Sequence, residues 1–363
     1  VVTDRWPQWL RINENLKELT PYGAPQLDIP HRLNTNENPY SLNDTVQKSI
    51  SESIMKQLVD LNRYPDRDAN QLRRELASFI NKRSKTNFGI ENIWAANGSN
   101  EILQSIALAF QGDALGFEPS YSMHPLITRA VGKRWISVPR DVQFNIELNS
   151  AVAAIESSKP GIVFITTPNN PTGGSTSLEN ISRIAAAARE KNAIVVVDEA
   201  YAEFSSQPSA VTLINEHPNL IVSRTMSKAF AFAGARLGYL IAQPVIIEAM
   251  LLIRLPYHLS SLTQAASLAA LSNEAILLAD VEKISQSRNE LARELASMGL
   301  AVLPSDANFL LVGGFKKTPQ EMWKALVAEG ILIRDVGIPG YLRITVGTDH
   351  DNRALVSALK KRS

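Results

Sequence analysis

A lysine among small hydroxyl residues is the first feature of this 363-residue sequence that suggests chemistry. Thr225 and Ser227 precede Lys228, and Arg236 follows it by eight positions. The amine can form an imine with an aldehyde cofactor, while the hydroxyl groups and the guanidinium can bind a phosphate dianion. This segment alone leaves open the alternative of a surface lysine on a turn rich in glycine and alanine.

A carboxylate and a phenol follow an apolar segment of strand length. Asp198 comes directly after residues 193–197, at the end of the strand where α/β sheets place ligand-binding groups. Its carboxylate could pair with a protonated pyridine nitrogen, and Tyr201 could reach a ring oxygen. The alternatives are an ordinary strand-end cap for Asp198 and a tyrosine at the edge of the core for Tyr201.

Two further segments have polar groups where strands or loops end. Residues 166–173 follow the strand-like segment 162–165, and their two prolines and glycine fix a turn that aims the Asn170 amide. Gly98, Ser99 and Asn100 precede a helical pattern, so backbone N–H groups at its start could bind an anion. Each motif is weak alone, because turns and capped helix starts are common.

The order and spacing of these motifs resemble the class II aminotransferase group of the fold-type I enzymes that use pyridoxal 5'-phosphate (PLP). The resemblance covers nearly the whole chain. It implies that Lys228 holds PLP as an imine and then acts as general base, that Asp198 and Tyr201 are also catalytic, and that Tyr121 stacks on the pyridine ring. The implied cofactor shell is Gly98, Ser99, Asn100, Tyr121, Asn170, Asp198, Tyr201, Thr225, Ser227, Lys228 and Arg236.

Four motifs also resemble the histidinol-phosphate aminotransferase family. They are LNTNENPY at 33–40, PYGA at 21–24, NRYP at 62–65, and the segments around two arginines near the C-terminus. The resemblance implies that L-histidinol phosphate and 2-oxoglutarate give imidazole acetol phosphate and glutamate. It also implies a homodimer, with the tyrosine of NRYP entering the partner's site. The implied substrate-binding residues are Tyr22, Asn36, Tyr64, Arg334 and Arg343.

The two arginines suit these substrates because a planar guanidinium binds phosphate and carboxylate groups with two hydrogen bonds. A salt bridge at the rim for Arg334 and a cation at a sheet edge for Arg343 are the alternatives. Three rival functions remain: an aromatic amino-acid aminotransferase, a PLP-dependent decarboxylase of a phosphorylated amino acid, and a ligand-binding transcription regulator on the same fold. The regulator ranks last because such proteins usually carry an added DNA-binding domain, whereas only about 35 residues precede the signature here and the net charge is near neutral.

Composition excludes several other classes of protein. The net charge of +1 and the lack of long basic runs argue against a nucleic-acid partner. Without cysteine there are no disulfides or thiolate metal sites, and the five histidines have no metal-binding spacing. They are interpreted as structural or surface residues, with His124 and His258 as candidates to line the substrate pocket. Residues 259–280 are too interrupted by polar residues to span a membrane, and the first residues do not resemble a signal peptide, so we expect a soluble cytoplasmic protein.

Alternating strand-like and helical segments predict an α/β fold that positions these groups. We expect an N-terminal arm (1–35), a large domain with a mostly parallel sheet covered by helices (36–255), and a smaller α+β C-terminal domain (256–363). A helix over 69–79 would be capped by Asp66 and Asp68, and a long helix over 262–298 would break near Asn273. Further helices are expected at 10–19, 45–58, 182–191 and 319–329, and strands at 162–165, 193–197, 220–222, 309–312 and 342–346.

Overall fold

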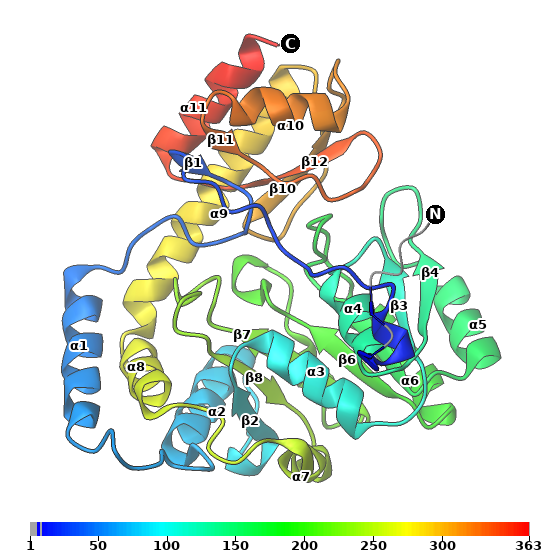
Figure 1. The fold of residues 1–363 in the computed structure, drawn as a ribbon, viewed down its shortest axis with the longest axis vertical. Helices are drawn as coiled ribbons and strands as arrows, with labels where there is room; N and C mark the ends of the chain where they lie inside the picture. The colour runs from blue at the N-terminus through cyan, green and yellow to red at the C-terminus, as the bar shows by residue number, and fades with distance from the viewer. Residues whose placement is uncertain (1–5, 8, 363) are drawn as a thin grey trace.

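The computed structural model describes residues 6–7 and 9–362, and a seven-stranded sheet forms its centre (Figure 1). The strand order is β2-β8-β7-β6-β5-β3-β4, and within this sheet only β8 runs antiparallel to its neighbours. The mostly parallel sheet is therefore confirmed. The strands are β2 (Ile93–Ala96), β3 (Ala114–Glu118), β4 (Trp135–Pro139), β5 (Ile162–Thr166), β6 (Ile194–Asp198), β7 (Leu220–Thr225) and β8 (Gly238–Ile241).

Helices cover both faces of this sheet. In β6, Val195 and Val197 pack into one hydrophobic cluster and Val196 packs into the other. Because both faces are buried, β6 and β7 are apolar along most of their length and do not alternate with polar residues, and their polar residues lie at the carboxyl ends. One face is covered by α2 (Asn70–Ser84), α5 (Leu148–Ser158), α6 (Leu178–Glu190) and α8 (Ser261–Ser272), and the other by α3 (Ser99–Ala109), α4 (Met123–Ala130) and α7 (Pro244–Ile253).

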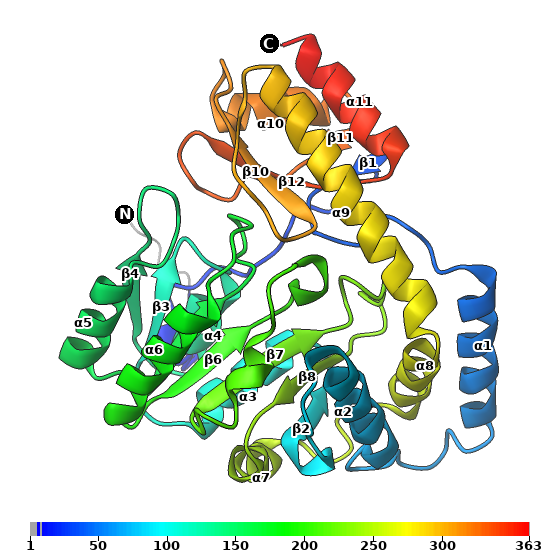
Figure 2. The same ribbon diagram turned by 180° about the vertical axis from the view of Figure 1, so that it is seen from behind.

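A smaller layer of strands and helices follows the large sheet. The antiparallel sheet β9-β10-β12 packs with α10, α11 and the second half of α9 around a hydrophobic cluster of its own. Figure 2 shows α9 running from the large sheet into this part of the molecule. The elements are α9 (Glu274–Ser297), β9 (Ala301–Val302), β10 (Phe309–Gly313), α10 (Pro319–Val327), β11 (Ile331–Leu332), β12 (Tyr341–Thr345) and α11 (Asp349–Lys360).

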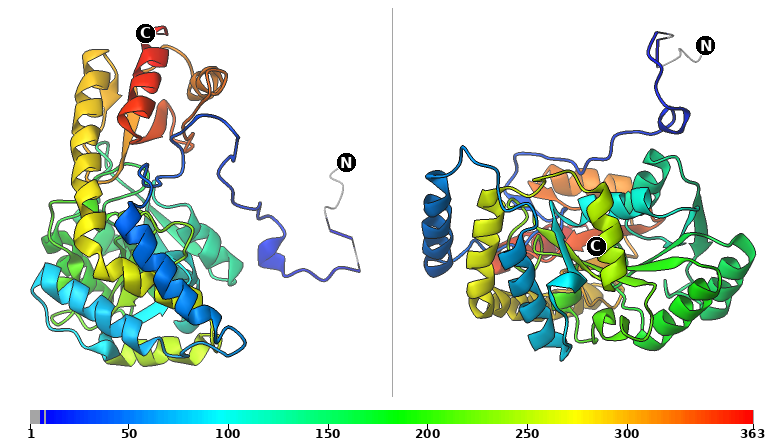
Figure 3. Two further views of the ribbon diagram at one scale, coloured as in Figure 1. Left: turned by 90° about the vertical axis from the view of Figure 1, so that its left-hand side faces the viewer. Right: turned by 90° about the horizontal axis from the view of Figure 1, so that it is seen from below.

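The N-terminal arm differs from the prediction. Instead of a helix over 10–19 it forms only the short 3-10 helix η1 (Glu14–Leu16), and Figure 3 shows it extending away from the body of the molecule. The prediction was wrong because a short helix is marginal on its own, and the contacts of this segment with α4 order only a single 3-10 turn. Further along, β1 (His31–Arg32) pairs in parallel with β11, and Leu33 packs into the core of the smaller layer.

The helix ends largely follow the predicted pattern. The break at Asn273 is confirmed, because α8 ends just before it, α9 begins just after it, and its amide donates to the carbonyl of Ala269. Asp66 accepts from the backbone N–H of Asn70 at the start of α2 (2.8 Å). Asp68 does not cap this helix. It pairs with Arg67 and Arg254, and these contacts lower its pKa to about 2.

The first helix, α1 (Asp44–Leu58), packs against α8. The domain boundary at residue 256 stays a prediction, and α8, which follows it, packs beside the large sheet.

In the described part of the chain, no helix is long and apolar enough to cross a membrane.

Candidate active site

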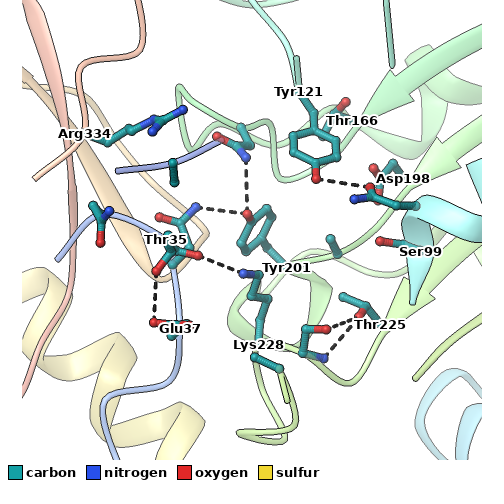
Figure 4. A pocket seen from close by; sticks show the side chains of 18 of the residues that line it. Thr35, Glu37, Ser99, Tyr121, Thr166, Asp198, Tyr201, Thr225, Lys228 and Arg334 are labelled. Carbon is teal, nitrogen blue, oxygen red and sulfur yellow. Dashed lines mark hydrogen bonds between the residues drawn. The ribbon is translucent and has the colours of Figure 1, made fainter. Parts of the chain in front are cut away.

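A cavity of about 300 Å³ lies at the carboxyl ends of β6 and β7, where the large sheet meets the arm and the smaller layer (Figure 4). Sequence segments more than 300 residues apart line it together. Most of the residues predicted to form the site are among these lining residues. They are Tyr22, Asn36, Ser99, Asn100, Tyr121, Asn170, Asp198, Tyr201, Thr225, Ser227, Lys228, Arg236, Arg334 and Arg343.

Lys228 lies on the loop after β7, and its Nζ donates to the backbone carbonyl of Thr35 at 2.9 Å (Figure 4). Burial, with a further contribution from the positive charge of Arg343, lowers the pKa of Lys228 to about 8. A larger fraction of the amine is therefore neutral near pH 8 than for an ordinary lysine. Because the neutral amine is the nucleophile, the site activates Lys228 for attack on a carbonyl group.

The lowered pKa predicts how the reactivity of the Lys228 amine depends on pH. In the folded protein without cofactor, labelling of Lys228 by a small amine-reactive reagent should rise with pH around a midpoint of about 8. After unfolding in denaturant, the midpoint should move to about 10.5, the ordinary value for lysine. Mass spectrometry of the labelled peptide measures both curves. Identical midpoints in the folded and unfolded protein would contradict the proposed activation.

Asp198 ends β6 and is buried on the wall of the cavity. His124 on α4 donates from Nε2 to Asp198 Oδ2 at 3.1 Å, while Oδ1 has no hydrogen-bond partner within the described residues. A buried carboxylate oxygen without a partner is costly, so a cationic or N–H group of a ligand is the expected partner. The ring of His124 stacks on Phe164 and meets the edge of Tyr121.

The role of His124 was not predicted. We named it as a candidate to line the substrate pocket, but it lies behind Asp198 and is 1% exposed. His258 also does not line the cavity, because its Nε2 contacts the carbonyl of Ala95 and its ring stacks on Trp94. The available signal was the spacing of Tyr121 and His124, because a turn that leads into α4 brings residues three positions apart close together.

The Tyr201 hydroxyl is held by two amide groups. It accepts from Asn36 Nδ2 at 3.0 Å and from Asn170 Nδ2 at 3.3 Å, as drawn in Figure 4. Both acceptor positions are thus filled, and the hydroxyl proton is available to a ligand in the cavity. Burial raises the pKa of Tyr201, which keeps the phenol protonated.

Arg343 on β12 connects the smaller layer to Asn170, which holds the Tyr201 hydroxyl. Its Nη1 donates to Asn170 Oδ1 and its Nη2 donates to the carbonyl of Asn34, both at 2.6 Å. Only Nε lacks a partner among the residues described. Arg343 therefore orients Asn170, and a direct contact with substrate stays a prediction.

The other end of the cavity suits an anion. Thr225 Oγ1 accepts from the Ser227 N–H at 3.1 Å, and the exposed guanidinium of Arg236 lies beside the start of α3. Gly98 does not line the cavity, but it has a φ of +85°, and a Cβ there would approach Arg236 Nη2 to 2.5 Å. Glycine thus allows the guanidinium to reach the positive end of α3, where an anion binds favourably.

The mouth of the cavity carries a second arginine. Arg334 lies over the ring of Tyr22, 5.9 Å from its centroid, and its Nη atoms are 3.5 Å from the carbonyl of Gly23. In the described structure it forms no ion pair with a carboxylate, so its charge is free for a ligand. The rim salt bridge that was the alternative for Arg334 is absent there.

Several lining residues were missed by the sequence analysis. Thr35 supplies the carbonyl for Lys228, and its hydroxyl donates to the Glu37 carboxylate at 2.9 Å. Both belong to the motif 33–40, of which only Asn36 had been assigned a role. The remaining missed residues are Ala24, Asn34, Thr166, Ala200 and Ala233.

Tyr64 lies away from this cavity. Its side chain is 79% exposed and its ring stacks on Tyr257, with centroids 4.3 Å apart. A role in a partner's site stays a prediction. No cluster of His, Asp or Glu suited to a metal ion occurs in residues 6–7 and 9–362.

Comparison with known proteins agrees with this geometry. The family model for class I and II aminotransferases matches residues 29–359. The chain belongs to this family. Within the family it is similar to histidinol-phosphate aminotransferases: that of Mycobacterium sp. (strain JLS) is 50% identical over 96% of this chain and 93% of its own length. The enzyme of Mycobacterium avium (strain 104) is 51% identical over 96% of this aminotransferase and 88% of its own length.

A solved structure of a more distant relative has the same fold. Histidinol-phosphate aminotransferase from Sinorhizobium meliloti, in complex with pyridoxal-5'-phosphate, is 26% identical and superposes with a TM-score of 0.83. The match covers 97% of this aminotransferase and 97% of that chain. The predicted fold class, a fold-type I aminotransferase with a large and a small layer, is therefore confirmed.

Proposed function

We propose that this aminotransferase transfers the amino group of L-histidinol phosphate to 2-oxoglutarate, with PLP as cofactor, in histidine biosynthesis. The observation that carries the proposal is the pairing of an activated Lys228 with an unpartnered Asp198 oxygen in one cavity. These two groups are what an aldehyde cofactor with a basic ring nitrogen requires. The roughly 50% identity to histidinol-phosphate aminotransferases supports the substrate.

The residues present fit PLP. Asp198 Oδ1 lacks a partner and would hold the protonated ring nitrogen, and Tyr201 would donate to the ring oxygen. Thr225, Ser227 and Arg236, together with the start of α3, would hold the phosphate. When bound, PLP supplies an electron sink for the charge that develops at the substrate's Cα.

The side chains then have separate tasks. Lys228 would hold the cofactor covalently until the amino substrate displaces it, and its freed amine would move the proton from the substrate's Cα to the cofactor. His124 orients the Asp198 carboxylate, and Asn170, held by Arg343, orients the Tyr201 hydroxyl. Arg334 and Tyr22 at the mouth would bind the phosphate of the substrate or the carboxylates of the acceptor.

A comparison of substrates tests the proposal. With 2-oxoglutarate as acceptor, kcat/KM for L-histidinol phosphate should exceed that for L-phenylalanine by at least about tenfold, because the substrate's phosphate gains a charged hydrogen bond worth about 1.5–3 kcal/mol. Carbon dioxide is measured in the same reactions. A higher kcat/KM for phenylalanine would assign an aromatic amino-acid aminotransferase, and stoichiometric carbon dioxide would assign a decarboxylase.

We also propose a homodimer in the cytoplasm. An exposed apolar surface runs over the end of α1, the turn after it and the loop before α8, and it supports association with a second copy. Tyr64 and Tyr257 stack on each other at this surface. Its exposed members are Met55, Leu58, Val59, Leu61, Tyr64, Leu255 and Tyr257.

Mixing two damaged variants tests whether Tyr64 acts in the partner's site. Tyr64→Ala and Lys228→Ala should each impair activity alone. After subunit exchange, roughly one quarter of wild-type activity should return, because half of the dimers are then mixed and each holds one intact site. The assay is run before and after a cycle of dissociation and reassociation. No gain on mixing would contradict the contribution in trans.

A further inference from the structure

A buried ionic network lies next to the cavity but does not line it. Arg224 near the end of β7 donates from Nη1 to Glu203 Oε1 at 2.7 Å, and its Nη2 lies 2.8 Å from Glu199 Oε2. The side chains of Arg224, Glu199 and Glu203 are 5%, 3% and 1% exposed, respectively. Such burial of charge is costly unless it is paired, and the fold retains it at one place beside the site.

The network is closed by a short 3-10 helix, η4 (Ala210–Leu213). Ser209 Oγ donates to Glu199 Oε2 at 2.7 Å and accepts from Arg224 Nη2 at 2.9 Å. The backbone N–H of Ala210 donates to Glu199 Oε1 at 2.6 Å. Both Glu199 oxygens are therefore fixed, and the carboxylate has one orientation.

Two of the three charged members lie next to a cavity residue in the sequence. Glu199 follows Asp198, and Arg224 precedes Thr225. These positions join adjacent parallel strands, because Asp198 pairs with Ser223 across β6 and β7. Successive strand residues face opposite sides of a sheet, so a contact on the far side fixes the backbone that presents the near-side groups.

Glu203 connects a third cavity residue, Tyr201, to the ionic network. It lies in η3 (Ala202–Phe204), the 3-10 helix that begins directly after Tyr201. A single guanidinium thus holds the chain beside Asp198, Tyr201 and Thr225. These are the groups proposed above for the ring nitrogen, the ring oxygen and the phosphate of PLP.

We propose that Arg224, with Glu199 and Glu203, is a positioning residue that sets the relative placement of Asp198, Tyr201 and Thr225. The inference rests on the proposed function. Arg224 touches neither cofactor nor substrate and acts through the backbone of three neighbours. The planar guanidinium of Arg224 is suited to this task because it binds two carboxylates in fixed directions. The ammonium group of a lysine is a point charge and does not fix these directions.

Two variants separate positioning from folding. Arg224→Met alone leaves two buried carboxylates without a cation, so the main variant is the neutral triple change Arg224→Met, Glu199→Gln and Glu203→Gln. The milder variant is Glu203→Gln, which keeps an acceptor for Arg224 and loses an oxygen, Oε2, that has no partner in the described structure. Arg73→Met is the matched control, because Arg73 is also buried, at 7% exposed, but binds the carbonyls of Ile90 and Ile93.

The holoenzyme is tested by circular dichroism of the bound cofactor, by its dissociation constant, by kcat and by thermal unfolding. The triple variant should lose on the order of 10²-fold in kcat, as expected for misplacement by about 1 Å, and much of the cofactor's dichroism. Glu203→Gln should shift the same readouts less, and it decides the question if the triple variant does not fold. Arg73→Met should lower the unfolding temperature and leave the dichroism and kcat unchanged.

The inference is overturned if the folded triple variant has the dichroism, cofactor affinity and kcat of the wild type. If only Glu203→Gln folds, the same result in that variant overturns it. Loss of dichroism in Arg73→Met equal to that in the network variants would also overturn it, because general destabilisation would then explain the effect. A wild-type protein that shows no cofactor signal at all would instead refute the proposed function.

Discussion

Lys228→Ala should abolish covalent attachment of PLP and lower kcat by about 10²–10⁴-fold or more, the range for loss of a general base. The amine has two tasks in the proposed reaction, and in the described structure no other lysine lines the cavity. Reduction with borohydride followed by peptide mass spectrometry should find cofactor mass on the peptide containing Lys228 in the wild type only. Activity is measured on the same samples.

Lys133→Ala is the matched control for this substitution. Burial also lowers the pKa of Lys133, but its Nζ donates to the carbonyls of Phe110 and Gly112, outside the cavity. This variant should keep the attached cofactor and wild-type turnover. If Lys228→Ala turns over normally, or if the cofactor mass lies on another peptide, the assignment of Lys228 is wrong.

Asp198→Asn should lower kcat by about 10²–10³-fold, comparable to the loss of one preorganised electrostatic contact in an active site. The amide has no negative charge, so it cannot keep the ring nitrogen protonated while charge develops at Cα. The contact from His124 Nε2 remains possible with the amide oxygen, so the fold should persist. Single-turnover kinetics of the half-reaction with L-histidinol phosphate measure the effect.

A cofactor with a methylated ring nitrogen provides the control for Asp198→Asn. Its permanent positive charge needs no carboxylate to retain a proton, so it should restore part of the activity of the variant and none to Lys228→Ala. Full activity of Asp198→Asn with unmodified PLP, or no rescue by the methylated form, would show that the carboxylate has another role.

The sequence was sufficient to predict the positions of side chains that local secondary structure places. Asp198 and Lys228 follow apolar strands, and parallel strands bring their carboxyl ends to one edge of a sheet, so their meeting in one cavity was predictable. The break at Asn273 was also predictable, because a polar residue interrupts an otherwise continuous helical pattern.

Contacts between distant segments were not predictable in the same way. The carbonyl of Thr35 that receives Lys228 is 193 residues away, and a backbone carbonyl has no sequence signature. The link from Arg343 to Asn170 spans 173 residues and depends on how the smaller layer meets the large sheet. The incorrect prediction of a helix over 10–19 has the same origin, because the conformation of this segment depends on how it lies against α4, where Asn15 donates to the carbonyl of Arg129.

The most direct test of the account is a spectral titration of the PLP-loaded protein in the absence of acceptor. L-Histidinol phosphate should remove the visible absorbance of the lysine-bound cofactor at one equivalent per subunit, and later addition of 2-oxoglutarate should restore it. That cycle is both halves of the proposed transamination. Absorbance that does not change with L-histidinol phosphate, or that is lost and not restored by 2-oxoglutarate, would contradict the account.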